Sequence, residues 1–392
     1  MKDAFLARAS DIHVEPGTAA TRIRFRIDGV VWDVAQIESD LAKLLINQFK
    51  AMASLDPVIG FTPKDAHAVW LSPEGRLDLR LALAPSHSGE ALSIRLLDPK
   101  RLDRSIEKLG LSDFNLRRLQ GWLEHVSGMF LAAGPTGSGK TTTLYSLLQA
   151  LKTTNRAIIT LEDPIEYRID GTTQIQIDKL HSLTFAEGVK AMLRLDPDYL
   201  MLGEIRDAAS ARAAVNAAIS GRVLLSTVHC ADAVGAVTAL RNWGLADHEI
   251  AESLSVVVAQ RLLRKLCPAC RRETVPTEGE RLWLETFGMD APVQCWKEMG
   301  CALCHQFGFF DRTGIFELWR LDEKDYAMIL GHSDEHAIRQ QLIARGHSTL
   351  VRSGMAKVAE GVTSIAELRR SAIGFFPSQQ TGVLHRQLKV PT

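Results

Sequence analysis

The sequence carries no net charge, because 46 lysines and arginines balance 46 aspartates and glutamates over 392 residues. This balance argues against a direct nucleic-acid partner held through phosphate contacts. No apolar run approaches the roughly 18–20 residues that a membrane span needs. Residues 1–16 also contain no apolar secretory core. We therefore expect a cytoplasmic protein, or one that attaches to a membrane only through partner proteins.

A phosphate-binding loop is the clearest feature that is present. Residues 129–151 are typical of a short buried strand, a glycine-rich turn and an amphipathic helix, and the turn GPTGSGKT fits G-x-x-x-x-G-K-[ST] without a mismatch. Its glycines let successive N–H groups face an anion, and the helix adds the positive end of its dipole. A glycine-rich surface loop is the alternative. The nucleotide-binding residues predicted from this pattern are Gly134, Pro135, Thr136, Gly137, Ser138, Gly139, Lys140, Thr141 and Thr142. In this arrangement Lys140 reaches the β- and γ-phosphates, and the Thr141 hydroxyl completes the shell of a Mg²⁺ ion.

The chain is too long for one ordinary core, so we expect two or three domains. Residues 22–34 alternate charged and apolar positions around the turn Asp28-Gly29, as a hairpin does. From Leu109 onward, apolar strand-like runs alternate with helical stretches, which predicts a mostly parallel, doubly wound α/β sheet. The predicted segments are an N-terminal α/β domain (1–98), a linker (99–108), the nucleotide-binding core (109–266), a cysteine-bearing insert (267–310) and a C-terminal helical region with a tail (311–392).

Acidic and histidine side chains follow three further predicted strands. Glu162 ends ITLE, Glu204 follows YLMLG, and His229 follows VLLSTV. A doubly wound sheet binds its ligands at these strand ends. Each residue alone has a structural alternative, since such carboxylates often cap helices and a lone histidine is usually a core group. Together they predict triphosphate hydrolysis, with Glu204 as first and Glu162 as second candidate to polarise the attacking water, and His229 to sense the γ-phosphate. Either carboxylate can instead ligate the metal through water.

Four of the six cysteines form two C-x₂-C pairs, at Cys267 and Cys270 and at Cys301 and Cys304. Two such pairs can place four thiolates at the corners of a tetrahedron, the geometry that structural Zn²⁺ prefers. Disulfides are the weaker explanation in a reducing cytosol. The sequence therefore predicts a zinc site. Cys230 and Cys295 have no such partners and are predicted to be ordinary thiols.

The set of motifs resembles the type II secretion and type IV pilus assembly ATPases. GPTGSGKT, LEDPIEY, DPDYLMLGEIRD and STVHCADA resemble the Walker A, Asp box, Walker B and His box of that family. The likeness runs from SDIHVEP (10–16) to GFFDRTGIFELW (308–319). It implies a RecA-like P-loop NTPase motor with a PAS-like N-terminal α/β domain and a small C-terminal zinc-binding, helix-rich region. It also implies ATP, Mg²⁺ and Zn²⁺ as ligands.

The resemblance further implies a homo-hexameric ring, peripheral at the inner face of the bacterial inner membrane and docked on a platform protein there. Arg80 and Arg95 match two arginines that relatives place over the γ-phosphate. The tetracysteine insert favours assembly or export over pilus retraction. The chain departs from the family pattern at 64–66, at 220–222 and at Cys230-Ala231, and it begins almost directly at the N-terminal α/β domain. These departures leave the motor residues untouched and bear on regulation and docking.

Two alternatives remain. One is a non-catalytic scaffold gated by nucleotide, which loss of the lysine or of the strand-end carboxylates would have favoured. The other is a conjugation or DNA-uptake ATPase, which the neutral charge and the lack of an aromatic-interleaved basic patch disfavour. These residues do not distinguish a role in pilus assembly from a role in type II secretion.

Overall fold

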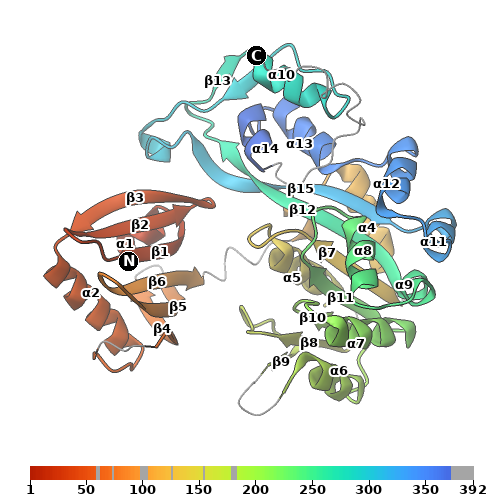
Figure 1. Ribbon diagram of the computed structural model, residues 1–392, viewed down its shortest axis with the longest axis horizontal. Helices are drawn as coiled ribbons and strands as arrows, with labels where there is room; N and C mark the ends of the chain where they lie inside the picture. The colour runs from red at the N-terminus through yellow and green to blue at the C-terminus, as the bar shows by residue number, and fades with distance from the viewer. Residues whose placement is uncertain are drawn as a thin grey trace, which may run out of the picture. The chain divides into compact units, whose positions relative to one another are not determined.

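The computed structural model describes residues 1–58, 62–72, 75–97, 105–124, 127–152, 155–177 and 183–371. The chain divides into two compact units, Met1–Asp103 and Arg104–Thr392, which are described separately (Figure 1). Residues 99–104 of the predicted linker and the predicted tail beyond residue 371 lie outside the described residues.

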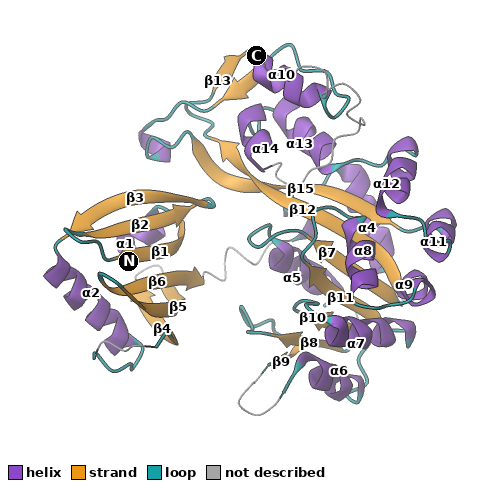
Figure 2. Ribbon diagram, viewed as in Figure 1, coloured by secondary structure: helices purple, strands orange, loops and turns teal. Residues whose placement is uncertain are grey.

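The first unit is a six-stranded antiparallel sheet of order β3-β2-β1-β6-β5-β4, and its described residues include the helices α1 and α2 (Figure 2). Leucines at alternate positions of β5 are buried, because successive side chains of a strand point to opposite faces. Asp28 and Gly29 have φ values of 48° and 87° and form the predicted hairpin turn. The elements are α1 (Lys2–Leu6), β1 (Ala9–Glu15), β2 (Thr21–Ile27), β3 (Val30–Ile37), α2 (Ser39–Met52), β4 (Lys64–Ser72), β5 (Gly75–Ser86) and β6 (Gly89–Leu97).

The second unit is built on a seven-stranded sheet of order β15-β12-β7-β11-β10-β8-β9. Every neighbouring pair in it is parallel except β12 with β15. This confirms the mostly parallel sheet that the alternating strand and helix pattern predicts. The strands are β7 (Gly128–Ala133), β8 (Ile158–Glu162), β9 (Thr173–Gln176), β10 (Tyr199–Leu202), β11 (Val223–Val228), β12 (Leu254–Leu266) and β15 (Phe309–Arg320).

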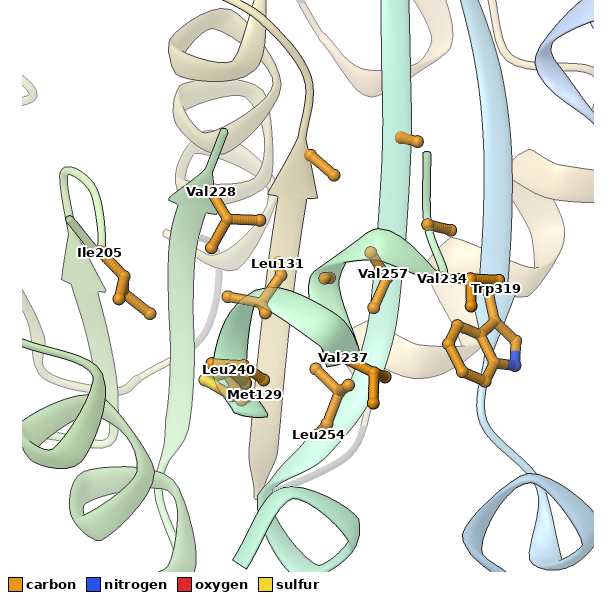
Figure 3. Close-up of a cluster of buried hydrophobic side chains, with 14 of the residues drawn as sticks. Met129, Leu131, Ile205, Val228, Val234, Val237, Leu240, Leu254, Val257 and Trp319 are labelled. Carbon is orange, nitrogen blue, oxygen red and sulfur yellow. The ribbon is translucent and has the colours of Figure 1, made fainter. Parts of the chain in front are cut away.

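Helices cover both faces of this sheet, and the alternation of side chains on β7 shows how. Met129 and Leu131 belong to one buried cluster with Val237 and Leu240 of α8 (Figure 3). Phe130 belongs to a second cluster on the opposite face, with the leucines of α5. The first face also carries α6, α7 and α9, and the second face carries α4. The bounds are α4 (Asp113–Leu123), α5 (Lys140–Leu151), α6 (Phe185–Leu193), α7 (Ala208–Ile219), α8 (Gly235–Asn242) and α9 (Asp247–Ser253).

Strand β15 was not predicted. The range 311–392 was predicted to be helical, yet it begins inside this strand, and its helices start at Glu323. The reason is tertiary: β15 pairs along its length with β12 and so becomes part of the seven-stranded sheet. The helices that follow are α11 (Glu323–Leu330), α12 (Glu335–Ala344), α13 (Leu350–Ala359) and α14 (Ile365–Ser371).

The cysteine-bearing segment lies between β12 and β15 in the sequence. It contains a two-stranded sheet of β13 (Arg272–Thr274) and β14 (Cys295–Lys297), the helix α10 (Glu278–Glu285) and a 3₁₀ turn at Ala302–Cys304. Helix α14 packs against β12, β14 and α10 and so holds this segment to the sheet. Among the described residues, no helix has both the length and the apolar character that crossing a membrane requires.

Candidate active site

The sheet order brings four predicted site segments to one edge. Strands β7, β11, β10 and β8 are consecutive and parallel, so their carboxyl ends lie side by side. Backbone hydrogen bonds join the segments that leave these strands. Gly134 N donates to Val228 O (3.2 Å), Ile205 N to Thr227 O (2.9 Å) and Gly203 N to Leu161 O (2.8 Å). The phosphate loop and the segments bearing His229, Glu204 and Glu162 are thereby fixed along this edge.

The phosphate loop adopts a conformation that glycine favours. Gly134, Gly137 and Gly139 have φ values of 154°, 77° and 91°. A Cβ on Gly134 would lie 2.7 Å from the Gln260 carbonyl oxygen, so the neighbouring strand also excludes a side chain there. Gly139 caps the N-terminus of α5, and Lys140 is the first residue of that helix. Pro135, Thr136, Gly137 and Thr141 are exposed, whereas Ser138 is buried.

Lys140 is buried at the base of the loop. Its ammonium group donates hydrogen bonds to the carbonyl oxygens of Gly134 (2.7 Å) and Pro135 (3.1 Å). Burial lowers the pKa of Lys140 to about 8. A phosphate anion beside this group would favour its charged form and raise that pKa again.

Nucleotide affinity should therefore depend on pH in the alkaline range. Lys140 has a lower pKa in the folded loop than it would have beside phosphate, so binding takes up a proton when the pH lies near or above 8. We expect ADP affinity to fall as the pH rises from 7.5 to 9.5, by up to about tenfold per unit. Titration calorimetry at several pH values between 7.5 and 9.5 measures the ADP affinity. Lys140→Arg is the control, because its guanidinium stays charged; an affinity of the wild type that stays constant to pH 9.5 would contradict the expectation.

Glu204 lies in a small charged cluster at the ends of β10 and β11. It forms an ion pair with Arg206, and its Oε2 lies 3.3 Å from His229 Nε2. Arg206 also lies 3.7 Å from the carboxylate of Asp163. The pKa of His229 is lowered first by burial and then by the positive charges of Lys140 and Arg206. The imidazole is therefore largely neutral near pH 7, and it can exchange a hydrogen bond with Glu204.

Glu162 is in a different environment. Its side chain is buried and accepts hydrogen bonds from the Tyr145 hydroxyl, from Thr160 Oγ1 (2.7 Å) and from Gln174 Nε2 (3.2 Å). Burial raises its pKa, and these donors oppose the shift. The carboxylate thus joins α5, β8 and β9, with its oxygens already engaged. This favours Glu204 over Glu162 as the group that polarises water.

Two residues of this region were not singled out from the sequence. Arg206 follows Glu204 in the same motif, but only its contacts reveal the ion pairs. Gln260, from β12, donates to Ser138 O (2.8 Å) and accepts from the Thr143 hydroxyl (2.8 Å). The available signal was the adjacent polar pair Gln260 and Arg261 inside the apolar run VVVAQRLL, because a buried amide needs partners.

Arg80 and Arg95 lie in the first unit, so their position relative to this edge is not described. They are directly opposite one another on β5 and β6. Arg95 Nε donates to the carboxylate of Asp11 on β1 (3.1 Å). Arg95 is exposed and Arg80 is half-buried. Both side chains therefore lie close together on one row of the antiparallel sheet.

The four predicted metal ligands meet in space. The sulfur atoms of Cys267, Cys270, Cys301 and Cys304 all lie within 4.8 Å of one another. Three of the Sγ–Sγ distances are 3.8 Å. A tetrahedral ion with metal–sulfur bonds of about 2.3 Å separates its ligands by about the same amount, so the site fits zinc.

The backbone also prepares one of these thiols, that of Cys304, for a cation. Cys304 Sγ accepts from the N–H groups of Cys301 and Gly308, both at 3.2 Å. Burial acts in the opposite direction, yet the N–H donors lower the pKa of Cys304 to about 7. Cys230 and Cys295 are not in the cluster, as predicted.

The sequence matches the family described as type II/IV secretion system protein over residues 1–370. The chain belongs to this family. It is 40% identical to the type II secretion system protein E of Aeromonas hydrophila, with the match covering 94% of this chain and 74% of that protein. It is 36% identical to the type IV pilus assembly ATPase TfpB of Acinetobacter baylyi, and this match covers 94% of this chain and 63% of that protein.

Known structures support the fold of this secretion system protein. The X-ray structure of the Legionella pneumophila ATPase DotB superposes with a TM-score of 0.69, covering 95% of this chain and 94% of that one. Only 21% of the residues are identical, so this likeness concerns the fold alone. The family resemblance stated from the motifs is confirmed, and so is the α/β fold class.

Proposed function

We propose that the chain is a Mg²⁺-dependent ATPase whose homo-hexameric ring powers assembly of type IV pili or of the pseudopili of type II secretion. The observation that carries the proposal is the shared edge of β7, β10 and β11, where Glu204 contacts His229 and the charge of Lys140 lies near enough to lower the pKa of His229. Relatives named as a type II secretion protein and as a type IV pilus assembly ATPase support the choice of machine. The ring would act at the cytoplasmic face of the inner membrane, bound to a platform protein and not to nucleic acid.

Each residue then has a role in the reaction. The N–H groups of the loop and the Lys140 ammonium bind the phosphates, and the dipole of α5 adds positive potential there. Glu204 orients a water molecule and accepts its proton, and His229 stabilises the position of the carboxylate. The Thr141 hydroxyl, at the start of α5, would help to hold Mg²⁺, which neutralises charge on the phosphates.

Purified chain should hydrolyse ATP in the presence of Mg²⁺, with a turnover per chain that rises with protein concentration as rings form. The matched control is Lys140→Ala, which removes the cation between the phosphates and should neither bind nor hydrolyse. A wild-type chain that binds ATP but never hydrolyses it, even as a ring, would favour the non-catalytic scaffold. Activity that requires DNA would favour the DNA-uptake alternative.

We also propose that the tetracysteine site holds one zinc ion. Freshly purified, reduced protein should contain about one zinc per chain, and Cys301→Ser should release it, because three thiolates and a hydroxyl bind Zn²⁺ less tightly. Hydrogen exchange should then rise between Cys267 and Cys304 while β7 and β11 stay protected. Cys295→Ala is the control and should keep its zinc, since Cys295 is outside the cluster. Metal analysis that finds no zinc in the wild type would end this proposal.

A further inference from the structure

Strand β12 lies beside β7, the strand that leads into the phosphate loop (Figure 1). The Gln260 side chain on β12 is 2% exposed. Its Nε2 donates to Ser138 O, and its Oε1 accepts from the Thr143 hydroxyl, both at 2.8 Å. Ser138 precedes and Thr143 follows the segment that carries Lys140. One side chain, distant in sequence, therefore holds both ends of this segment.

The contact with Ser138 determines the direction of an N–H group. The C=O of residue 138 and the N–H of residue 139 belong to one trans peptide, in which the two groups point in opposite directions. Because Gln260 holds the Ser138 oxygen on its own side, the Gly139 N–H must point away from Gln260. The contact with Thr143 likewise fixes the first turn of α5. These are the backbone parts with which such a loop binds an anion.

Gln260 also limits the loop through its backbone and its neighbour. If Gly134 carried a Cβ, that atom would lie 2.7 Å from the Gln260 carbonyl oxygen. A Cβ on Gly139 would lie 3.1 Å from Gln260 Nε2. The same carbonyl accepts a hydrogen bond from Arg261, which donates in turn to Ala231 O in the His-box segment (2.8 Å). Two adjacent residues of β12 thus hold the phosphate loop and the segment after His229.

We propose that Gln260 is a positioning residue that sets the phosphate loop for the β-phosphate of the nucleotide. It acts through Ser138 and Thr143 and does not itself touch the nucleotide. This inference rests on the proposed nucleotide site. When the loop is already ordered, less of the binding energy is lost in ordering it. Loss of the Gln260 contacts should therefore appear as weaker nucleotide affinity.

The test compares Gln260→Met, which keeps the length and the apolar burial but removes both hydrogen bonds, with Thr143→Val, which removes only the helix contact. We expect Gln260→Met to weaken ADP binding about tenfold and to raise KM for ATP similarly, with kcat within threefold. Thr143→Val should weaken ADP binding less than threefold, because the Ser138 contact remains. Thr143→Ser, which keeps the hydroxyl, should match the wild type.

A purely structural role gives a different result. In that case Gln260→Met lowers the unfolding temperature and the active fraction, so kcat falls while KM and the ADP affinity stay within twofold of wild type; this outcome overturns the inference. Gln260→Leu provides a second apolar variant should Gln260→Met fail to fold. A wild-type chain that binds no ADP refutes the proposed nucleotide site itself, whereas wild-type binding with an equally tight Gln260→Met variant refutes only the role of Gln260.

Discussion

Glu204→Gln should reduce ATP turnover by about 10²–10⁴-fold while ATP still binds. The amide keeps the size of the side chain but cannot accept a proton from water. The phosphate contacts of Lys140 and the loop are untouched, so affinity should stay within a few fold of wild type. Steady-state hydrolysis and nucleotide binding, measured on the same ring preparation, separate the two effects.

Glu162→Gln is the matched control, because the same chemical change is made at the other candidate. Its carboxylate is engaged by Tyr145, Thr160 and Gln174. We expect the free energy of unfolding of this variant to fall by about 1–3 kcal/mol, while each folded chain retains most of its turnover. Normal hydrolysis by Glu204→Gln with loss of turnover in Glu162→Gln would reverse the two assignments.

Arg80→Ala and Arg95→Ala should each slow turnover by about 10³–10⁵-fold if the arginines act on the γ-phosphate. Such an arginine stabilises charge that develops mainly in the transition state, so ATP affinity should change little. Asp11→Asn is an informative companion, since it removes the negative charge beside Arg95 Nε. It should give a smaller loss than Arg95→Ala, because the arginine remains but is less well oriented.

If the proposed rings form, mixed rings would show whether the arginines act within their own subunit. Chains carrying Arg95→Ala are combined with chains carrying Lys140→Ala, each inactive alone. Recovered hydrolysis means that an intact arginine from one chain serves an intact loop on another. If both arginine variants turn over at the wild-type rate in a formed ring, these arginines take no part in hydrolysis and the N-terminal unit acts only as a spacer.

The phosphate loop was predictable because its chemistry depends on consecutive residues, whose glycines and lysine can be recognised without a fold. The strand-end positions of Glu204 and His229 were also predictable, since short apolar runs preceded them. The motif could not distinguish Glu204 from Glu162. That difference depends on Tyr145 and Gln174, which reach Glu162 from α5 and β9.

Gln260 and β15 were missed for a related reason. The partners of Gln260 lie 117 and 122 positions away in the sequence, and no local pattern connects them. Strand β15 joins the sheet only through its long pairing with β12. Contacts across such distances depend on the assembled sheet, which local periodicity does not encode.

The cysteine-bearing segment leaves and re-enters the sheet at neighbouring positions. Leu266 pairs with Phe309, and Cys267 N donates to Gly308 O (2.9 Å). A short hairpin turn between these two residues would leave the path of every sheet strand unchanged. Insertions and deletions in this segment should therefore be tolerated during evolution, with the loss of its packing against α14 as the main cost. The same place is suited to the insertion of a reporter domain that leaves the sheet intact.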